Sequence, residues 1–118
     1  MKKLILLLHI CLLPMCVSCQ TEQTFKSVDV AEFEKVIADT SYVLLDVRTA
    51  TEYAEGHIPG THFNIDVLQE SFESEALRVL RKKKKVALYC RSGNRSKNAA
   101  RILSEKGLQV VELSTGFK

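Results

Sequence analysis

Cysteine is scarce in the part of the chain that can fold. Three of the four cysteines, Cys11, Cys16 and Cys19, lie within the first twenty residues. Cys90 is therefore the only thiol of the remaining chain, and an internal disulfide there is excluded because no second cysteine is present. A lone thiol is either a small buried hydrophobe or a reactive group, and its surroundings must decide between the two.

The chain also lacks a strong excess of either charge. Seventeen Lys and Arg residues stand against fourteen Asp and Glu. Removal of a leader that carries Lys2 and Lys3 would leave fifteen basic residues and a net charge of +1. A nucleic-acid footprint needs a basic excess, so we expect no nucleic-acid partner. We interpret the one basic cluster, Arg81 to Lys85, as a solvated loop, with contact to anionic lipid headgroups as the alternative.

No apolar run is long enough to span a membrane. The longest, Leu4 to Leu13, is broken by His9 and follows the basic pair Lys2 and Lys3. A basic start, a short apolar core and small residues near position 18 are typical of a secretory signal peptide. We therefore predict that residues 1–18 form a signal peptide and that the mature protein is exported.

The end of this leader resembles a bacterial lipoprotein cleavage site. The sequence "CVSC" ends on Cys19 and is followed by the polar "QTEQT". The resemblance implies a lipid on Cys19, a linker over residues 19–26 and a folded domain over residues 27–118. We expect a periplasmic or membrane-anchored lipoprotein that contacts the membrane through its lipid. Plain secretion is the alternative.

Hydrophobic periodicity alternates between the strand and helix periods along the domain. Helical spacing of apolar residues covers 27–39, 66–82 and 96–107, and Ser27 or Asp29 can cap the first of these helices. Apolar runs typical of buried strands cover 42–47, 85–89 and 108–114, with a possible short strand at 61–65. Residues 49–56 suit a turn or a short helix. This alternation predicts an α/β fold with a mostly parallel sheet of about five strands, flanked by helices.

Cys90 falls at the carboxyl end of the strand 85–89, directly before a helix. Ligands of parallel sheets bind at these strand ends, and a helix N-terminus offers free N–H groups. Gly93 allows a tight curl of the backbone around the sulfur, and Arg91 and Arg95 add positive charge. All of these features favour a thiolate, so we predict a reactive cysteine.

Three blocks resemble the single-domain rhodaneses, which are sulfurtransferases. They are "LLDVR" at 44–48, Glu52 with "GHIPG" at 56–60, and "YCRSGNRS" at 89–96. The resemblance implies a three-layer fold in which Cys90 is the catalytic nucleophile. It implies an anion-binding loop of Arg91, Ser92, Gly93, Asn94 and Arg95, with Asp46, Arg48 and Glu52 as supporting residues. It implies no metal or other cofactor, and we expect a monomer.

The same resemblance suggests the reaction. A Cys90 persulfide would carry sulfur from thiosulfate or another small anionic sulfur donor to a thiol or cyanide-like acceptor. One departure concerns the C-terminus, where "STGFK" begins the family's closing tract with Thr115 in place of the first glycine. The chain then stops at Lys118, so the family's C-terminal helix is missing and we expect one face of the sheet to be partly uncovered.

Residues of the supporting set have expected partners. Asp46 ends a buried strand, so its carboxylate needs loop N–H groups or an arginine. Arg48 and Glu52 are four residues apart and would pair on a helix. His57 of "GHIPG" could act as a base, but an activated thiolate needs none, so we assign His57 to a structural turn.

Two other functions compete with sulfur transfer. Cysteine phosphatases and arsenate reductases separate cysteine and arginine by five residues, so that the loop surrounds a tetrahedral oxyanion. Here four residues separate Cys90 from Arg95, which favours the smaller sulfur atom. The other alternative is a non-catalytic rhodanese-like binding module, although such modules typically lose the cysteine that this chain keeps.

Overall fold

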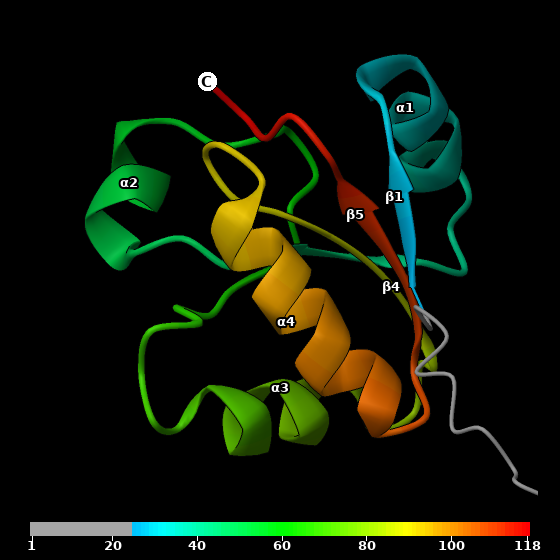
Figure 1. Cartoon of the computed structure of the whole chain (residues 1–118), viewed down its shortest axis with the longest axis vertical. Coiled ribbons are helices and arrows are strands. Elements are labelled where there is room, and N and C mark those ends of the chain that lie inside the picture. Colours follow the sequence, from blue (N-terminus) through cyan, green and yellow to red (C-terminus); the bar gives the residue numbers. More distant parts are fainter. Residues whose placement is uncertain (1–24) are drawn as a thin grey trace, which may run out of the picture.

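The computed structural model describes residues 25–118 (Figure 1). The predicted signal peptide and the lipidated Cys19 therefore lie outside the described residues. Along the chain the elements are β1 (Lys26–Val28), α1 (Val30–Ala38), β2 (Val43–Asp46), α2 (Ala50–Glu55), β3 (Phe63–Asn64), α3 (Phe72–Leu80), β4 (Lys85–Tyr89), α4 (Asn94–Glu105) and β5 (Gln109–Leu113). Within the described part of the chain, no helix is both long and apolar enough to span a bilayer.

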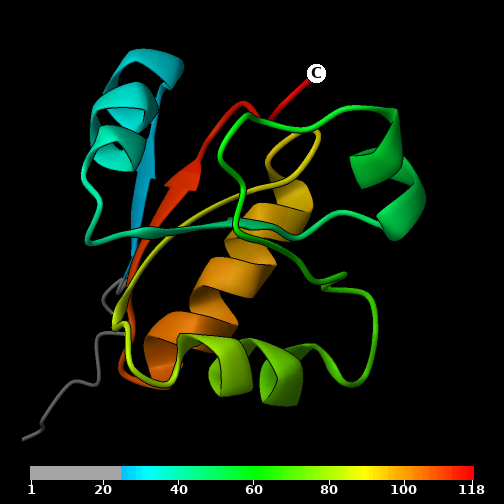
Figure 2. The ribbon, with the colours of Figure 1, turned by 180° about the vertical axis from the view of Figure 1, so that it is seen from behind.

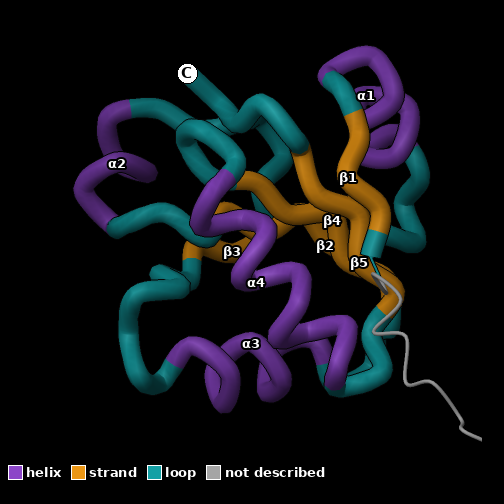
Figure 3. The backbone as a smooth tube through the Cα atoms, in the orientation of Figure 1, coloured by secondary structure: helices purple, strands orange, loops and turns teal. Residues whose placement is uncertain are grey.

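The five strands form one sheet in the order β1-β5-β4-β2-β3, and every neighbouring pair is parallel (Figure 3). This confirms the predicted five-stranded sheet, which is fully rather than mostly parallel. The N-terminal strand β1 was not predicted, because three residues carry too little periodicity. It pairs Lys26 with Val111 of β5, so the sheet begins one residue before the predicted domain boundary at 27.

Local sequence accounts for the helix starts. Asp29 caps α1, since its side chain accepts a hydrogen bond from the Glu32 N–H at 2.9 Å. Ser27, the other candidate cap, lies in β1 instead. Thr49 and Glu52 form a reciprocal capping box at the start of α2. This box turns the segment after β2 into a helix.

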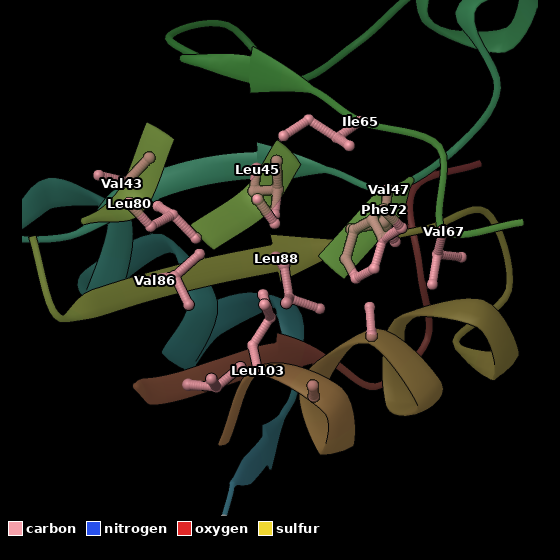
Figure 4. Close-up of a cluster of buried hydrophobic side chains, with 14 of the residues drawn as sticks. Val43, Leu45, Val47, Ile65, Val67, Phe72, Leu80, Val86, Leu88 and Leu103 are labelled. Carbon is pink, nitrogen blue, oxygen red and sulfur yellow. The ribbon is translucent and has the colours of Figure 1, made fainter. Parts of the chain in front are cut away.

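The helices cover both faces of the sheet (Figures 1 and 2). Alternation along β4 sends Val86 and Leu88 to one face, where Cys90 follows them, and Ala87 and Tyr89 to the other. The first face packs against α3 and α4, and Figure 4 shows its core. The residues labelled there are Val43, Leu45, Val47, Ile65, Val67, Phe72, Leu80, Val86, Leu88 and Leu103. The second face packs against Phe33 of α1.

Two predicted helices have different boundaries. α3 begins at Phe72 instead of residue 66, because the intervening residues form turns. There the Leu68 N–H donates to the Asp66 carboxylate at 2.9 Å. α4 begins at Asn94, two residues before the predicted start, so the loop after Cys90 is shorter than the sequence suggested.

The second face carries an apolar groove. A cavity of about 530 Å³ is bordered by α1, the "GHIPG" turn and the chain after β5. Val30 on its rim is 52% exposed. The apolar side chains of β2, β4 and β5 on this face are nevertheless at most 4% exposed, so the expectation of a partly uncovered sheet face is wrong for the described residues.

Candidate active site

Cys90 directly follows β4 and is completely buried. The segment that follows curls at Ser92 and Gly93 and enters α4 at Asn94. Figures 1 and 2 show this loop at the carboxyl edge of the sheet, between α2 and the C-terminal residues. The topology therefore places the cysteine at the sheet edge where parallel α/β folds bind their ligands, as the sequence predicts.

The sulfur of Cys90 accepts hydrogen bonds from the loop that surrounds it. The Gly93 N–H lies 3.1 Å from Sγ. Burial alone would raise the pKa of the Cys90 thiol. The Ser96 side chain and the backbone N–H groups of Ser96, Gly93 and Ser92 reverse this effect, and the pKa lies below its usual value. The loop is therefore built to hold an anionic sulfur.

Gly93 is required by the shape of the loop. It adopts a left-handed φ of 96° and occupies the N-cap position of α4 without a side-chain cap. A Cβ atom at this position would lie 2.1 Å from the Ser114 carbonyl oxygen. The segment after β5 is restricted in the same way by the loop. A Cβ atom added at Gly116 would lie 2.2 Å from the Arg91 carbonyl oxygen. The active loop and the segment after β5 are thus in close backbone contact.

The two arginines of the loop differ in their surroundings. Arg95 donates both terminal nitrogens to Glu52 of α2, at 2.7 and 2.9 Å. This ion pair raises the pKa of Arg95, and the negative charge of Cys90 raises it further. Arg91 is exposed, as are Ser92 and Asn94. Of the two predicted cationic residues, Arg91 is thus the one with a solvent-facing side chain.

Asp46 and Arg48 form a buried pair beneath this site. The guanidinium of Arg48 donates from Nη2 to Asp46 Oδ2 at 2.6 Å, and from Nε to both carboxylate oxygens at 3.0 Å. The expectation that an arginine satisfies Asp46 is confirmed. The expected Arg48–Glu52 pair is wrong, because Arg48 lies before α2 and turns back to Asp46, while Glu52 binds Arg95.

The "GHIPG" segment is held as a structural turn. Arg48 Nη2 donates to the Gly56 carbonyl at 2.7 Å, and the Tyr89 hydroxyl accepts from the Ile58 N–H at 3.1 Å. His57 is exposed and stacks on the Tyr53 ring with centroids 3.8 Å apart. These contacts agree with a structural role for this turn.

A network that the sequence analysis missed lies behind the loop. Ser96 donates to the carboxylate of Glu112, a fully buried residue of β5, at 2.6 Å. Lys97 forms an ion pair with the same carboxylate at 3.1 Å. The available signal was a single acidic residue within the apolar run "VVELS", which marks a buried charge that needs partners.

A cavity of about 590 Å³ opens beside the loop. Its lining includes Arg48, Glu52, Glu55, Gly56, Arg91, Phe117 and Lys118. Among residues 25–118, no group of three or more His, Cys, Asp or Glu side chains could hold a metal ion. The site therefore combines a buried thiol, whose anionic form the loop stabilises, with an adjacent cavity lined mainly by charged residues.

Comparison with protein families assigns the chain to a class. The Rhodanese-like domain family matches residues 29–118, which include the whole loop and its supporting residues. The chain belongs to the rhodanese-like domain family. The resemblance noted in the three sequence blocks is thereby confirmed.

Individual relatives agree with this class. The chain is 38% identical to YtwF of Bacillus subtilis over 85 residues, which cover 71% of this chain and 78% of that protein. It is 39% identical to the thiosulfate sulfurtransferase PspE of Escherichia coli over 74 residues, covering 63% and 69%. Its fold resembles a rhodanese-related protein from Thermoplasma volcanium, with 33% identity, a TM-score of 0.63 and coverage of 78% and 86%. These relatives support a role in sulfur transfer.

Proposed function

We propose that the protein is a thiosulfate- or persulfide-dependent sulfurtransferase that carries sulfane sulfur on Cys90. The observation that carries the proposal is the set of hydrogen-bond donors around the Cys90 sulfur, which lowers the pKa of a fully buried thiol. A thiolate is the nucleophile that attacks sulfane sulfur. The relationship to PspE, a thiosulfate sulfurtransferase, supports the choice of donor.

The reaction balances in two displacements. The Cys90 thiolate attacks the outer sulfur of thiosulfate, a new S–S bond forms, and sulfite leaves with the electron pair of the broken S–S bond. A cyanide or thiolate acceptor then attacks the outer sulfur of the persulfide, and Cys90 leaves as a thiolate. Both cysteine states are anionic, so the same loop N–H groups stabilise each of them.

Arg91 is the residue that we assign to donor attraction. It is exposed and lines the cavity beside the loop together with Lys118. Cations at the entrance of a site raise the local concentration of an anionic substrate.

The geometry of Arg95 argues against phosphate chemistry. A cysteine phosphatase uses its loop arginine as a two-pronged donor to the bound oxyanion. Here both terminal nitrogens of Arg95 are occupied by Glu52. Together with the spacing of four residues between Cys90 and Arg95, this pair supports sulfur as the transferred group.

Product analysis tests the proposal. The full chain is incubated with thiosulfate and cyanide, and thiocyanate and sulfite are measured. We expect both products in equal amounts, and neither with the Cys90→Ser variant. A wild-type protein that forms no thiocyanate and instead hydrolyses p-nitrophenyl phosphate would support the phosphatase. A folded protein with neither activity would support a non-catalytic binding module.

We further propose that the protein is exported and anchored to a membrane by a lipid on Cys19. The proposal is supported by the basic, apolar and "CVSC" features of residues 1–19. Mass spectrometry of the protein from bacterial membranes tests it. We expect an N-terminal Cys19 peptide that carries acyl chains, whereas soluble cytosolic protein that retains Met1 would contradict the anchor.

A further inference from the structure

The carboxylate of Glu112 lies behind the active loop, where the transfer reaction requires no acid. Glu112 has no exposed surface. Its Oε2 atom accepts from Ser96 Oγ at 2.6 Å, and its Oε1 atom accepts from the Ser27 hydroxyl. Lys97 Nζ lies 3.1 Å from Oε1. These partners compensate the burial of a negative charge, but Ser96 also interacts with the sulfur of Cys90, so the role of the carboxylate calls for a separate explanation.

The Ser96 hydroxyl has one proton and three possible acceptors. They are the Glu112 carboxylate at 2.6 Å, the Gly93 carbonyl at 3.0 Å and the sulfur of Cys90. A charged oxygen at the shorter distance is a stronger acceptor than a neutral carbonyl. A carboxylate oxygen also accepts hydrogen bonds more readily than a diffuse sulfur. Glu112 therefore competes with Cys90 for the Ser96 proton, so the Ser96 side chain lowers the pKa of Cys90 less than it would without this carboxylate.

We propose that Glu112 is a positioning residue that sets the reactivity of Cys90, because it competes for the Ser96 proton and places a negative charge behind the sulfur. Its effect on catalysis rests on the proposed sulfur transfer. Its effect on the thiol does not, and the two can be measured separately.

Glu112 has two effects that act in the same direction. It weakens the hydrogen bond from Ser96 to the thiolate, and its charge repels the charge on sulfur. Both raise the pKa of Cys90 relative to a loop without this carboxylate. A thiolate of higher pKa is intrinsically the better nucleophile, with a Brønsted coefficient of about 0.4–0.5. The loop makes the thiolate available, and Glu112 keeps it reactive.

The repulsion from Glu112 also increases the rate of sulfur uptake, because it destabilises the resting Cys90 thiolate more than the persulfide. In the persulfide the negative charge is centred on the outer sulfur, which lies one S–S bond farther from Glu112. Repulsion between like charges decreases with distance, so it is relieved as the charge moves outward. An interaction that is less unfavourable in the transition state than in the thiolate increases the rate of the step.

Other charged groups face the same region and must be held constant. Lys97 and Arg95 project from α4, and Glu52 of α2 pairs with Arg95. Asp66 also interacts electrostatically with Arg95, and Arg91 lies next to Cys90 in the loop. β1 contributes only the uncharged Ser27 at this point. Replacement of Glu112 by the isosteric Gln leaves each of these groups in place.

The first measurement is the pKa of Cys90 in the full chain, read from thiolate ultraviolet absorbance after subtraction of the Cys90→Ser signal. We expect Glu112→Gln to lower this pKa by about one unit, since one charge repulsion is removed and one donor is released. The matched control is Glu105→Gln, which removes a carboxylate from an exposed pair with Arg101. We expect the control to leave the pKa of Cys90 unchanged.

The second measurement is the rate of sulfur uptake from thiosulfate as a function of pH. A thiol pKa lowered by one unit makes Glu112→Gln about threefold faster than wild type below both pKa values. Above both pKa values the variant should be about threefold slower, because its thiolate is less nucleophilic. The two profiles therefore cross. A merely structural role would instead lower the rate at every pH.

Ser96→Ala provides a second variant that does not depend on the stability of Glu112→Gln. Because Glu112 competes for the Ser96 proton, we expect Ser96→Ala alone to raise the pKa of Cys90 only modestly. In the Glu112→Gln background the same change should raise the pKa by a larger amount.

Three results would overturn the proposal: an unchanged or raised pKa in Glu112→Gln, a rise of a unit or more in Ser96→Ala alone, or equal effects of Ser96→Ala in both backgrounds. If the pKa behaves as expected but wild type takes up no sulfur, the role of Glu112 at the thiol stands and the proposed function fails.

Discussion

Arg95 of α4 and Glu52 of α2 form a two-pronged ion pair, with N–O distances of 2.7 and 2.9 Å. The pair connects the end of the active loop to the helix that follows β2. The hydrogen bond from Arg95 is the main cause that holds the pKa of Glu52 at about 2. About a fifth of each side chain is exposed, so the pair is shielded from most of the solvent.

This pair should make part of the stability depend on acid pH. The pKa of Glu52 is lowered on folding, so its contribution is complete above about 4.5 and is lost as pH falls toward about 2. We expect Glu52→Gln to reduce the free energy of unfolding by roughly 1–3 kcal/mol at pH 7. Denaturant titrations should show this difference shrinking toward zero near pH 2. A difference that is constant with pH, or that Glu105→Gln reproduces, would contradict the assignment.

Gly93 should tolerate no side chain. Gly93→Ala combines a left-handed φ of 96° with a Cβ only 2.1 Å from the Ser114 carbonyl oxygen. Gly107 is the matched control, since it has φ of 88° but open space around its Cβ position. We expect Gly107→Ala to cost about 1 kcal/mol through backbone strain alone. Gly93→Ala should cost at least about 3 kcal/mol and disrupt the active loop. If urea titrations show the same loss of unfolding free energy in both variants, the contact with Ser114 does not contribute to the effect.

Asp46 should be required as the buried counter-ion of Arg48. Asp46→Asn leaves the guanidinium buried without a compensating charge, which costs about 3–5 kcal/mol in comparable sites. Both residues are at least nine-tenths buried. Glu73→Gln, in the exposed pair with Lys106, is the control and should change stability by less than about 0.5 kcal/mol. Thermal unfolding of both variants measures the contrast, and similar midpoints would argue against a supporting role for Asp46.

Arg91 should act on the capture of an anionic donor. We expect Arg91→Ala to lower kcat/KM for thiosulfate roughly threefold to tenfold and to flatten its dependence on salt. Lys83→Ala removes the same charge from the loop before β4, at the amino ends of the strands and away from the Cys90 loop. Its kcat/KM should equal that of wild type. If kcat/KM falls by the same factor in both variants, the donor is attracted by the net charge of the protein and not by Arg91.

The sequence was sufficient to predict the cysteine loop and every element except β1, because these depend on local patterns. The strands 43–46 and 85–89 are continuous apolar runs, and the position of Cys90 at a strand end follows from them. The short β1 could not be predicted, since its pairing with β5 depends on residues more than eighty positions away.

Side-chain partners were harder to predict than elements. The four-residue spacing suggested that Arg48 binds Glu52, but the chain direction after β2 returns Arg48 to Asp46. Glu52 is then free for Arg95, forty-three positions further along the chain. Glu112 reaches Ser96 and Lys97 only because β5 packs beside α4. Such contacts follow from tertiary packing, which periodicity does not report.

The mass of the Cys90 peptide after treatment with thiosulfate tests the central claim most directly. The full chain is incubated with thiosulfate, its folded state is verified by circular dichroism, and the peptide is analysed without reductant. We expect a gain of one sulfur atom on Cys90, which cyanide removes and which Cys90→Ser does not acquire. A folded protein whose Cys90 peptide keeps its original mass would contradict the claim.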